Sequence, residues 1–187
     1  MSENYIIDQT FSQDKTLTKG EYENCTFQNC DFSNFDFSDF KFIECLFEDC
    51  NLSLLKLNNT VFRDVKFCAC KMLGLHFEQC NPFGLAFQFE HCQLKHTSFY
   101  QLKIKSTIFK NSQLEECDFT EADLSQSVFE NCNLLNAIFE QTNMEKCDYR
   151  TAVNYVVDPE NNRIKKAKFS AIGLYGLLHK YDIEIEN

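Results

Sequence analysis

Large apolar residues recur at every fifth position through most of this chain. The series runs from Tyr22 to Phe87, interrupted only by Pro82, then slips by two residues and resumes from Leu94 to Tyr149. Of the 20 Phe, 14 stand at this position, which we call the large position. A period of five matches neither the two-residue repeat of a strand nor the 3.6-residue repeat of a helix. A simple sheet and a helical bundle are therefore both excluded.

The residue two places before each large position, which we call the small position, holds most of the cysteines. Ten of the 11 Cys stand there, Cys68 being the exception. No charged residue occupies the small or the large position of any repeat, whereas acidic and basic residues fill the other three. Two positions of each pentapeptide are thus predicted to point inward and three outward.

The cysteines admit a second interpretation, as a disulfide framework or a metal site. Their number is odd, no C-x-x-C pair occurs, and the N-terminus lacks the basic start and apolar run of an export signal. Cys30, Cys50 and Cys70 would stack if residues 20 apart were neighbours, but Ala, Ser, Thr and Val substitute freely at the small position. We therefore expect them to pack as small buried residues, with no metal and no cofactor.

A solenoid explains the period. Short extended pieces joined by tight turns can stack coil on coil, each turn pairing with the next as parallel β-structure. No run of 18 apolar residues is present, so we expect no membrane-spanning helix and no membrane partner.

Individual repeats resemble a known motif. Cys-Asp-Phe-Ser-Asn at 30–34 and Ala-Asp-Leu-Ser-Gln at 122–126 are similar to the A(D/N)LXX motif of pentapeptide-repeat proteins, and the resemblance covers roughly residues 20–150. It implies an all-β solenoid, a right-handed quadrilateral parallel β-helix with 20 residues per turn and about seven turns. On that geometry Phe27, Phe47, Phe67 and Phe87 form one ladder, and Phe89 becomes exposed at the register slip.

Three segments are predicted on this basis. Residues 1–19 form a lead-in or cap, and residues 20–169 form the β-helix, with a register break near 82–92 and a loop near 154–162. Residues 170–187 form a C-terminal helix, with Ser170 as its N-cap, followed by a short strand at Ile183–Ile185.

The C-terminal segment resembles the dimerisation module of Qnr quinolone-resistance members of the family. The stretch Asp158–Ile164 is also similar to the corresponding stretch of microcin immunity members. This resemblance implies an end-to-end homodimer formed by the apolar residues of the helix: Ile172, Leu174, Tyr175, Leu177, Leu178 and Tyr181.

The net charge of −10 falls in blocks along the sequence. Residues 20–50 hold eight acids and one base, and residues 51–110 hold three acids and eight bases. Residues 111–149 hold nine acids and one base. The resemblance implies a DNA mimic that binds DNA gyrase or topoisomerase IV and protects it from quinolones or toxins, because a surface that attracts phosphates also attracts carboxylates. The acidic candidates for this contact are Glu115, Glu116, Asp118, Glu121, Asp123, Glu130, Asp31 and Asp36.

Other functional classes fit the sequence less well. The four His are scattered, and neither a Gly-rich phosphate loop nor a G-x-S-x-G motif occurs, so we expect no catalytic residues and no enzyme. The net charge opposes direct binding of nucleic acid. The missing export signal predicts a cytoplasmic protein. A structural or adaptor rod for another protein partner stays open as the alternative.

Overall fold

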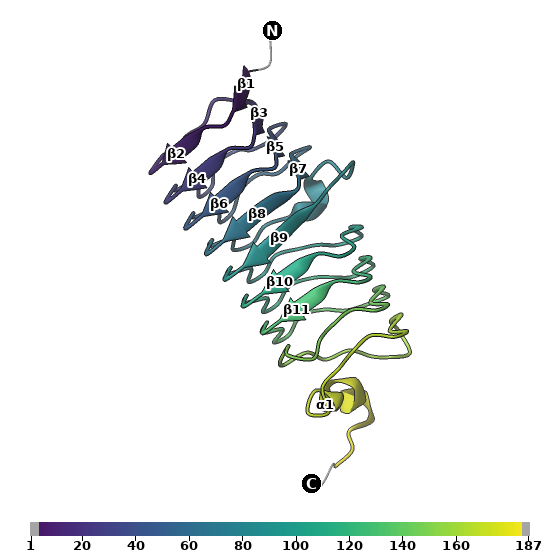
Figure 1. Ribbon diagram of the computed structural model, residues 1–187. Coiled ribbons are helices and arrows are strands. Elements are labelled where there is room, and N and C mark those ends of the chain that lie inside the picture. Colours follow the sequence, from purple (N-terminus) through teal and green to yellow (C-terminus); the bar gives the residue numbers. More distant parts are fainter. Residues whose placement is uncertain (1–3, 185–187) are drawn as a thin grey trace.

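Two parallel β-sheets run side by side along a rod (Figure 1). The computed structural model describes residues 4–184. The shorter sheet has the order β1-β3-β5-β7 and consists of β1 (Asn4–Ile7), β3 (Gly20–Glu23), β5 (Lys41–Ile43) and β7 (Val61–Arg63). The longer sheet has the order β11-β10-β9-β8-β6-β4-β2 and consists of β2 (Thr10–Ser12), β4 (Thr26–Gln28), β6 (Leu46–Glu48), β8 (Val65–Cys68), β9 (Phe87–Glu90), β10 (Ile108–Lys110) and β11 (Val128–Glu130). The helical pieces are η1 (Phe77–Gln79), α1 (Leu174–Leu178) and η2 (His179–Tyr181).

Strand pairing confirms the parallel solenoid and its 20-residue turn. Phe27 pairs with Phe47, and Phe109 pairs with Phe129. The seven strands of the longer sheet mark about six turns, where the repeats predict about seven. Beyond β11 the pairing continues only as isolated bridges, which reach Asp148 and then Lys168. At the other end β1 and β2 add a first, shorter turn from residues expected to be a lead-in.

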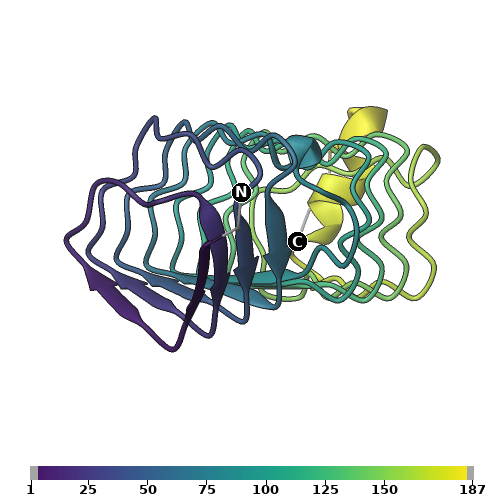
Figure 2. The same cartoon turned by 90° about the horizontal axis from the view of Figure 1, so that it is seen from above.

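Each pentapeptide bends at the residue two places after its large position. Asn24, Asn29 and Asn34 have φ of 49°, 54° and 59°, in the left-handed region that Asn and Asp tolerate better than most residues. Gly74 takes the same place with φ 64°. Four such corners in each 20-residue turn fold the chain back on itself, and Figure 2 shows the stacked turns from one end. The right-handed sense of the coil stays a prediction.

The large positions form the core, as predicted. The rings of Phe27 and Phe47 stack with centroids 4.5 Å apart, and those of Phe47 and Phe67 with centroids 5.3 Å apart. Full burial of such a ring contributes about 1.5–3 kcal/mol. The whole ladder behind the longer sheet comprises Phe11, Phe27, Phe47, Phe67, Phe89, Phe109, Phe129, Tyr149 and Phe169.

The small position does more than fill space, because its side chain bonds to the preceding turn. Cys50 Sγ donates to the carbonyl oxygen of Phe27 at 3.3 Å, and the Thr60 hydroxyl donates to that of Phe37 at 2.8 Å. Cys, Ser and Thr interchange here because each is small and each can donate. All 11 cysteines are free thiols; ten are buried, and Cys68 is half-buried. Among residues 4–184 no three or more side chains are arranged to hold a metal ion.

The register slip lies earlier than the sequence pattern predicts, and the expected exposure of Phe89 is wrong. Phe89 pairs with Phe67 and is 0% exposed, while Phe87 pairs with Val65 and takes the small position. The two extra residues therefore fall within 81–86. Pro82 has no N–H to give to a ladder, and the chain bulges outward there, leaving Phe83 76% exposed.

The C-terminal helix is shorter than predicted. It begins after Gly173 rather than Ser170, although the Ser170 hydroxyl still accepts a hydrogen bond from the Gly173 N–H at 3.1 Å. A Cβ at Gly173 or Gly176 would overlap Tyr155, so the backbone of this segment lies directly on the last turn. No strand forms at residues 183–184, and the third residue of the predicted strand, 185, lies outside the described residues. Within 4–184, no helix is both long and apolar enough to cross a membrane.

Candidate partner-binding surface

The solenoid sorts outward side chains into columns, because residues one turn apart lie next to each other. Asp36 and Lys56 are neighbours in one such column. Further along the rod, the same side carries Ser98, Asp118 and Ile138, again one turn apart. Charges that are distant in the sequence therefore share a side, and charges that are close in the sequence can face different ways. The acidic and basic blocks counted along the sequence therefore do not describe how charge is distributed over the surface of the rod.

The eight predicted acidic residues lie on four sides of the rod. Glu115 and Glu116 follow the column that starts at Asp31. Asp123 pairs with Lys103 on the side of the shorter sheet, and Glu130 ends β11 in the longer sheet. No more than three of the eight share any one side. A second group of three lies on another side, which we call the acidic side, and consists of Asp36, Asp118 and Glu121.

Two of the predicted acids are neutralised by neighbouring cations. Glu116 lies 3.4 Å from the Lys95 ammonium and 3.0 Å from the His96 ring. Asp123 lies 3.2 Å from the Lys105 ammonium. Burial disfavours ionisation of Asp123, but hydrogen bonds from Ser125 and Lys105 outweigh it and lower its pKa. These two carboxylates therefore form ion pairs with side chains of the rod itself.

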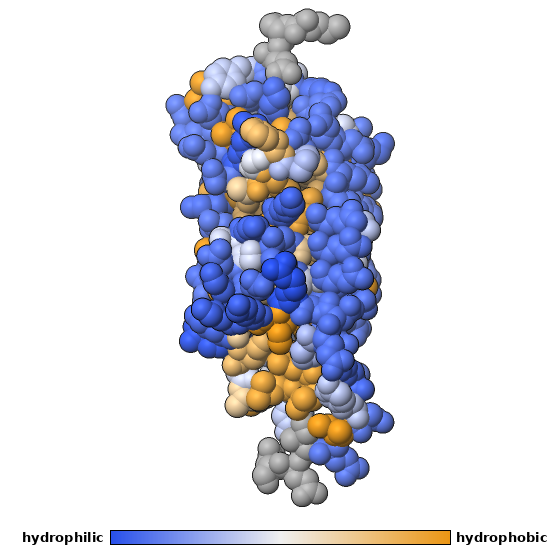
Figure 3. Space-filling model, turned by 90° about the vertical axis from the view of Figure 1, so that its right-hand side faces the viewer, coloured by the Kyte–Doolittle hydropathy of each residue, from blue (hydrophilic) through white to orange (hydrophobic). Residues whose placement is uncertain are grey.

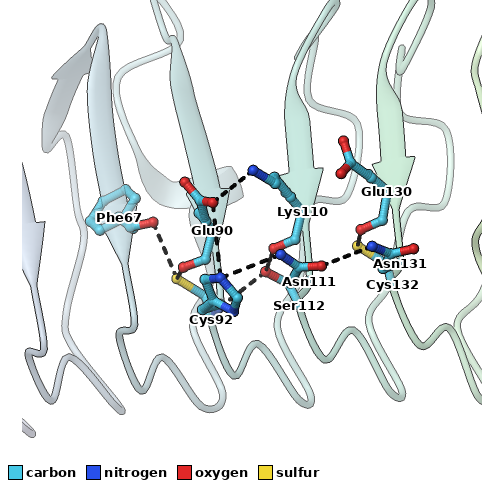
Figure 4. Close-up of polar contacts among 10 residues, drawn as sticks. Phe67, Glu90, Cys92, Lys110, Asn111, Ser112, Glu130, Asn131 and Cys132 are labelled. Atoms are coloured by element: carbon cyan, nitrogen blue, oxygen red, sulfur yellow. Dashed lines mark hydrogen bonds and ion pairs between the residues drawn. The ribbon is translucent and has the colours of Figure 1, made fainter.

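Glu130 belongs to a column of alternating charge (Figure 4). The Lys110 ammonium lies 2.9 Å from Glu90, so this lysine stands between two glutamates on successive strands. Beside this column, Asn131 donates to the Asn111 side chain at 3.0 Å, continuing a ladder of polar side chains. The surface around Glu130 is thus mixed rather than acidic.

The acidic side carries more carboxylates than the sequence blocks predict. Some of its acids pair with uncharged amides, which leave their charge in place: Gln101 donates to Glu121 at 2.8 Å, and Asn161 donates to Glu140 at 2.9 Å. Others pair with cations: Lys19 lies 2.7 Å from Asp39, and Lys180 lies 2.6 Å from Asp158 and 2.7 Å from Glu160. A hydrogen bond from Ser38 lowers the pKa of Asp36, so it is ionised at neutral pH. The carboxylates of this side are Asp36, Asp39, Glu78, Asp118, Glu121, Glu140, Asp158 and Glu160.

Five members of this set were missed by sequence reasoning, and one simple signal finds most of them. Asp39, Glu78 and Glu140 each stand one or two places after a large position on the same side as Asp118. Reading the outward residues every 20 positions, instead of counting charges in blocks, groups them. Lys56 interrupts the column of Asp36, and Lys19 and Lys180 form ion pairs with other acids of this side.

The predicted dimerisation residues divide into two groups. Ile172 is 83% exposed, and Leu174, Tyr175 and Tyr181 are also exposed, whereas Leu177 and Leu178 are half-buried. A cavity of about 650 Å³ lies between α1 and the last turn, with Tyr155 and Tyr175 in its lining. Figure 3 shows apolar surface gathered near this end of the rod. One face of α1 therefore covers the rod and the other is free.

Known proteins share this architecture. A sequence profile described as the pentapeptide repeat region matches residues 21–88 and 85–169. A trypsin-treated variant of QnrB1, a plasmid-mediated fluoroquinolone resistance protein, superposes with a TM-score of 0.66 at 16% identity over 100% of both chains. Full-length QnrB1 gives a TM-score of 0.57 at 18% identity, over 96% of this chain and 100% of that one. Comparison with curated protein sequences gave no match. At these identities the structural likeness shows the fold alone.

Proposed function

The chain belongs to the pentapeptide-repeat family, and on that premise we propose that it is a non-enzymatic DNA mimic that binds DNA gyrase or topoisomerase IV. Its acidic side would occupy part of the surface on which the enzyme holds DNA, with other DNA still bound beside it, and so protect the enzyme from quinolone-type or toxin-type poisons. A partner of this kind places the protein in the bacterial cytoplasm.

The observation that carries this proposal is a group of carboxylates without cations on successive turns of one side. Asp118, Glu121 and Glu140 have no ion-pair partner among residues 4–184, and adjacent turns of a parallel β-structure lie about 4.8 Å apart. A DNA-binding surface presents Lys and Arg spaced for phosphates, and it attracts regularly spaced carboxylates through the same long-range electrostatics. The same fold occurs in QnrB1, a plasmid-mediated fluoroquinolone resistance protein, which fits a role in protection from quinolones.

Two buried cysteines, Cys45 and Cys147, fit a role without catalysis. Burial raises the pKa of both Cys45 and Cys147 to about 12, so neither thiol supplies a thiolate nucleophile at neutral pH. Both donate to backbone carbonyls of neighbouring turns and thus serve the fold.

A charge-neutralising variant tests the acidic side. Asp118→Asn, Glu121→Gln and Glu140→Gln together remove three charges while each side chain keeps its shape. Glu44→Gln, Asp49→Asn and Asp64→Asn are the matched control, since these are exposed acids on other sides. Binding to purified gyrase should weaken at least tenfold in the first variant and less than threefold in the control. Equal losses in the two variants would contradict an oriented acidic contact.

We propose that the exposed face of α1 joins two copies end to end. Ile172, Leu174 and Tyr175 form an apolar surface on a short element that already rests on the rod. Ile172→Asp with Tyr175→Asp should halve the mass measured by light scattering. Leu54→Asp is the control, because Leu54 is 56% exposed on the rod itself. A wild-type monomer at micromolar concentration would refute the dimer.

The alternative, an adaptor rod for another protein, rests on the breaks in the acidic surface. Lys56 interrupts the acidic side, and the carboxylates of Glu116 and Asp123 are engaged by lysines. Capture from the native host separates the two proposals. A dominant partner other than a topoisomerase would favour the adaptor.

A further inference from the structure

A basic corner lies on the last two turns of the rod, although the chain as a whole is acidic. It consists of exposed cations on the side that carries the shorter sheet and at the edge it shares with the longer one. These residues are Lys146, Arg163, Lys165, Lys166 and Lys168.

Strand register brings these cations together. The Lys146 N–H donates to the carbonyl oxygen of Lys165 at 3.0 Å, so the two lysines lie on adjacent turns. Lys146 and Lys166 both occupy left-handed corners, with φ of 61° and 62°, and corners project furthest from the rod. The basic corner is therefore a compact group built from two turns.

Most of its charge is uncompensated. Arg163 lies 2.9 Å from Glu145, and Lys168 lies 3.8 Å from Asp148. The ammonium groups of Lys146, Lys165 and Lys166 have no hydrogen-bond or ion-pair partner within residues 4–184. The corner thus keeps a net charge of about three positive units. Along the axis of the rod it lies at about the same height as Glu140, which belongs to the acidic side.

The acidic side and the basic corner together fit a partner that carries both positive and negative charge. A topoisomerase holding DNA presents cations on the protein and phosphates on the nucleic acid next to one another. We propose that the basic corner contacts the phosphodiester backbone of duplex DNA bound to the enzyme. This inference rests on the proposed function, and it reverses the expectation, drawn from net charge alone, that the chain makes no contact with nucleic acid.

The residues around the corner favour phosphate over a lipid surface. In the turns above it, Gln126 occupies an outward corner and can donate hydrogen bonds to phosphate and sugar oxygens, whereas Ser125 and Asn143 already donate to Asp123. A membrane-binding surface would instead need apolar side chains between the lysines.

The expected strength follows from counterion release. About three phosphates neutralised gives a salt slope of about −2.7, so affinity should fall about 40-fold between about 50 mM and about 200 mM salt. The net charge of −10 weakens binding to free DNA further, and a dissociation constant of roughly 10⁻⁴–10⁻⁵ M at the lower salt is expected.

Fluorescence anisotropy with a labelled DNA duplex of about 30 base pairs measures this directly. The test variant is Lys146→Glu, Lys165→Glu and Lys166→Glu. Glu suits the two corner positions, since Glu116 and Glu121 already occupy equivalent corners. The control, Lys56→Glu, Lys66→Glu and Lys71→Glu, makes the same charge change at exposed sites elsewhere. Thermal unfolding of both variants checks that the rod is intact.

The test variant should lose at least tenfold in affinity for the duplex, and the control less than threefold. Absence of duplex binding by the wild type at low salt, equal losses in both variants, or binding to anionic phosphatidylglycerol vesicles without binding to DNA would each overturn the proposal. Gyrase binding without DNA depends on the acidic side and is measured separately. Failure of the basic corner therefore leaves the proposed function standing, and the reverse also holds.

Discussion

Tyr149 places a hydroxyl inside the aromatic ladder, where the weakly polar Cys147 thiol is its polar neighbour. Its ring stacks 4.5 Å from Phe129 and 5.5 Å from Phe169, its side chain is 0% exposed, and its Oη forms no hydrogen bond of ordinary geometry among the described residues. Burial accordingly raises its pKa far above the ordinary value for a tyrosine. A buried polar group without a partner costs about 1–3 kcal/mol. We therefore expect Tyr149→Phe to raise the free energy of unfolding by about 1–2 kcal/mol.

Tyr22 is the matched control, because it occupies a large position with its hydroxyl satisfied. It is 2% exposed and donates to the Thr18 carbonyl oxygen at 2.6 Å. Tyr22→Phe should lower stability by about 0.5–1.5 kcal/mol, so the same substitution has opposite signs at two places. Each kcal/mol should move the thermal midpoint by about 2–4 °C in a chain of this size. Tyr149→Phe that melts at or below the wild-type temperature would refute the assignment of an unsatisfied hydroxyl.

Three more changes test other parts of the fold. Phe67→Ala should cost about 3–5 kcal/mol by leaving a cavity in the middle of the ladder, measured by urea unfolding; a cost under about 1 kcal/mol would contradict tight packing. Gly176→Ala should undock α1, since its Cβ would overlap the Tyr155 carbonyl oxygen, and faster amide hydrogen exchange confined to the C-terminal segment would report it. The Lys180 ammonium holds the pKa of Asp158 below its ordinary value. This contribution to stability is present above about pH 4 and is lost as pH falls through the lowered pKa, so Lys180→Met should reduce the thermal midpoint at pH 7 and have a progressively smaller effect as the pH falls below about 4.

The period-five pattern is enough to predict the inside and the outside of the rod, because charge is excluded from two positions in every repeat. It cannot locate the slip. Phe87 and Phe89 stand two apart, which is also the spacing of the small and large positions, so either can be read as the large one. The choice depends on where the chain can bulge, and Pro82 with Gly84 (φ 69°) decides it.

The candidate surface was predicted less completely for a related reason. Acids counted along the sequence form blocks, but the 20-residue turn distributes Glu116, Asp118 and Asp123 over different sides. The start of the C-terminal helix was predicted wrongly because it depends on the packing of Gly173 and Gly176 against Tyr155. No local sequence pattern shows that contact. Partners across a turn, rather than neighbours in the sequence, determine both features.

Protection of gyrase from a quinolone tests the central claim most directly. Drug-stabilised DNA cleavage by purified gyrase is measured with increasing amounts of the wild type or of the Asp118→Asn, Glu121→Gln, Glu140→Gln variant, at low and at high salt. The wild type should reduce cleavage, high salt should weaken the effect, and the variant should require at least tenfold more protein for the same protection. Cleavage unchanged by the wild type at low salt would contradict the central claim, as would equal protection by the variant.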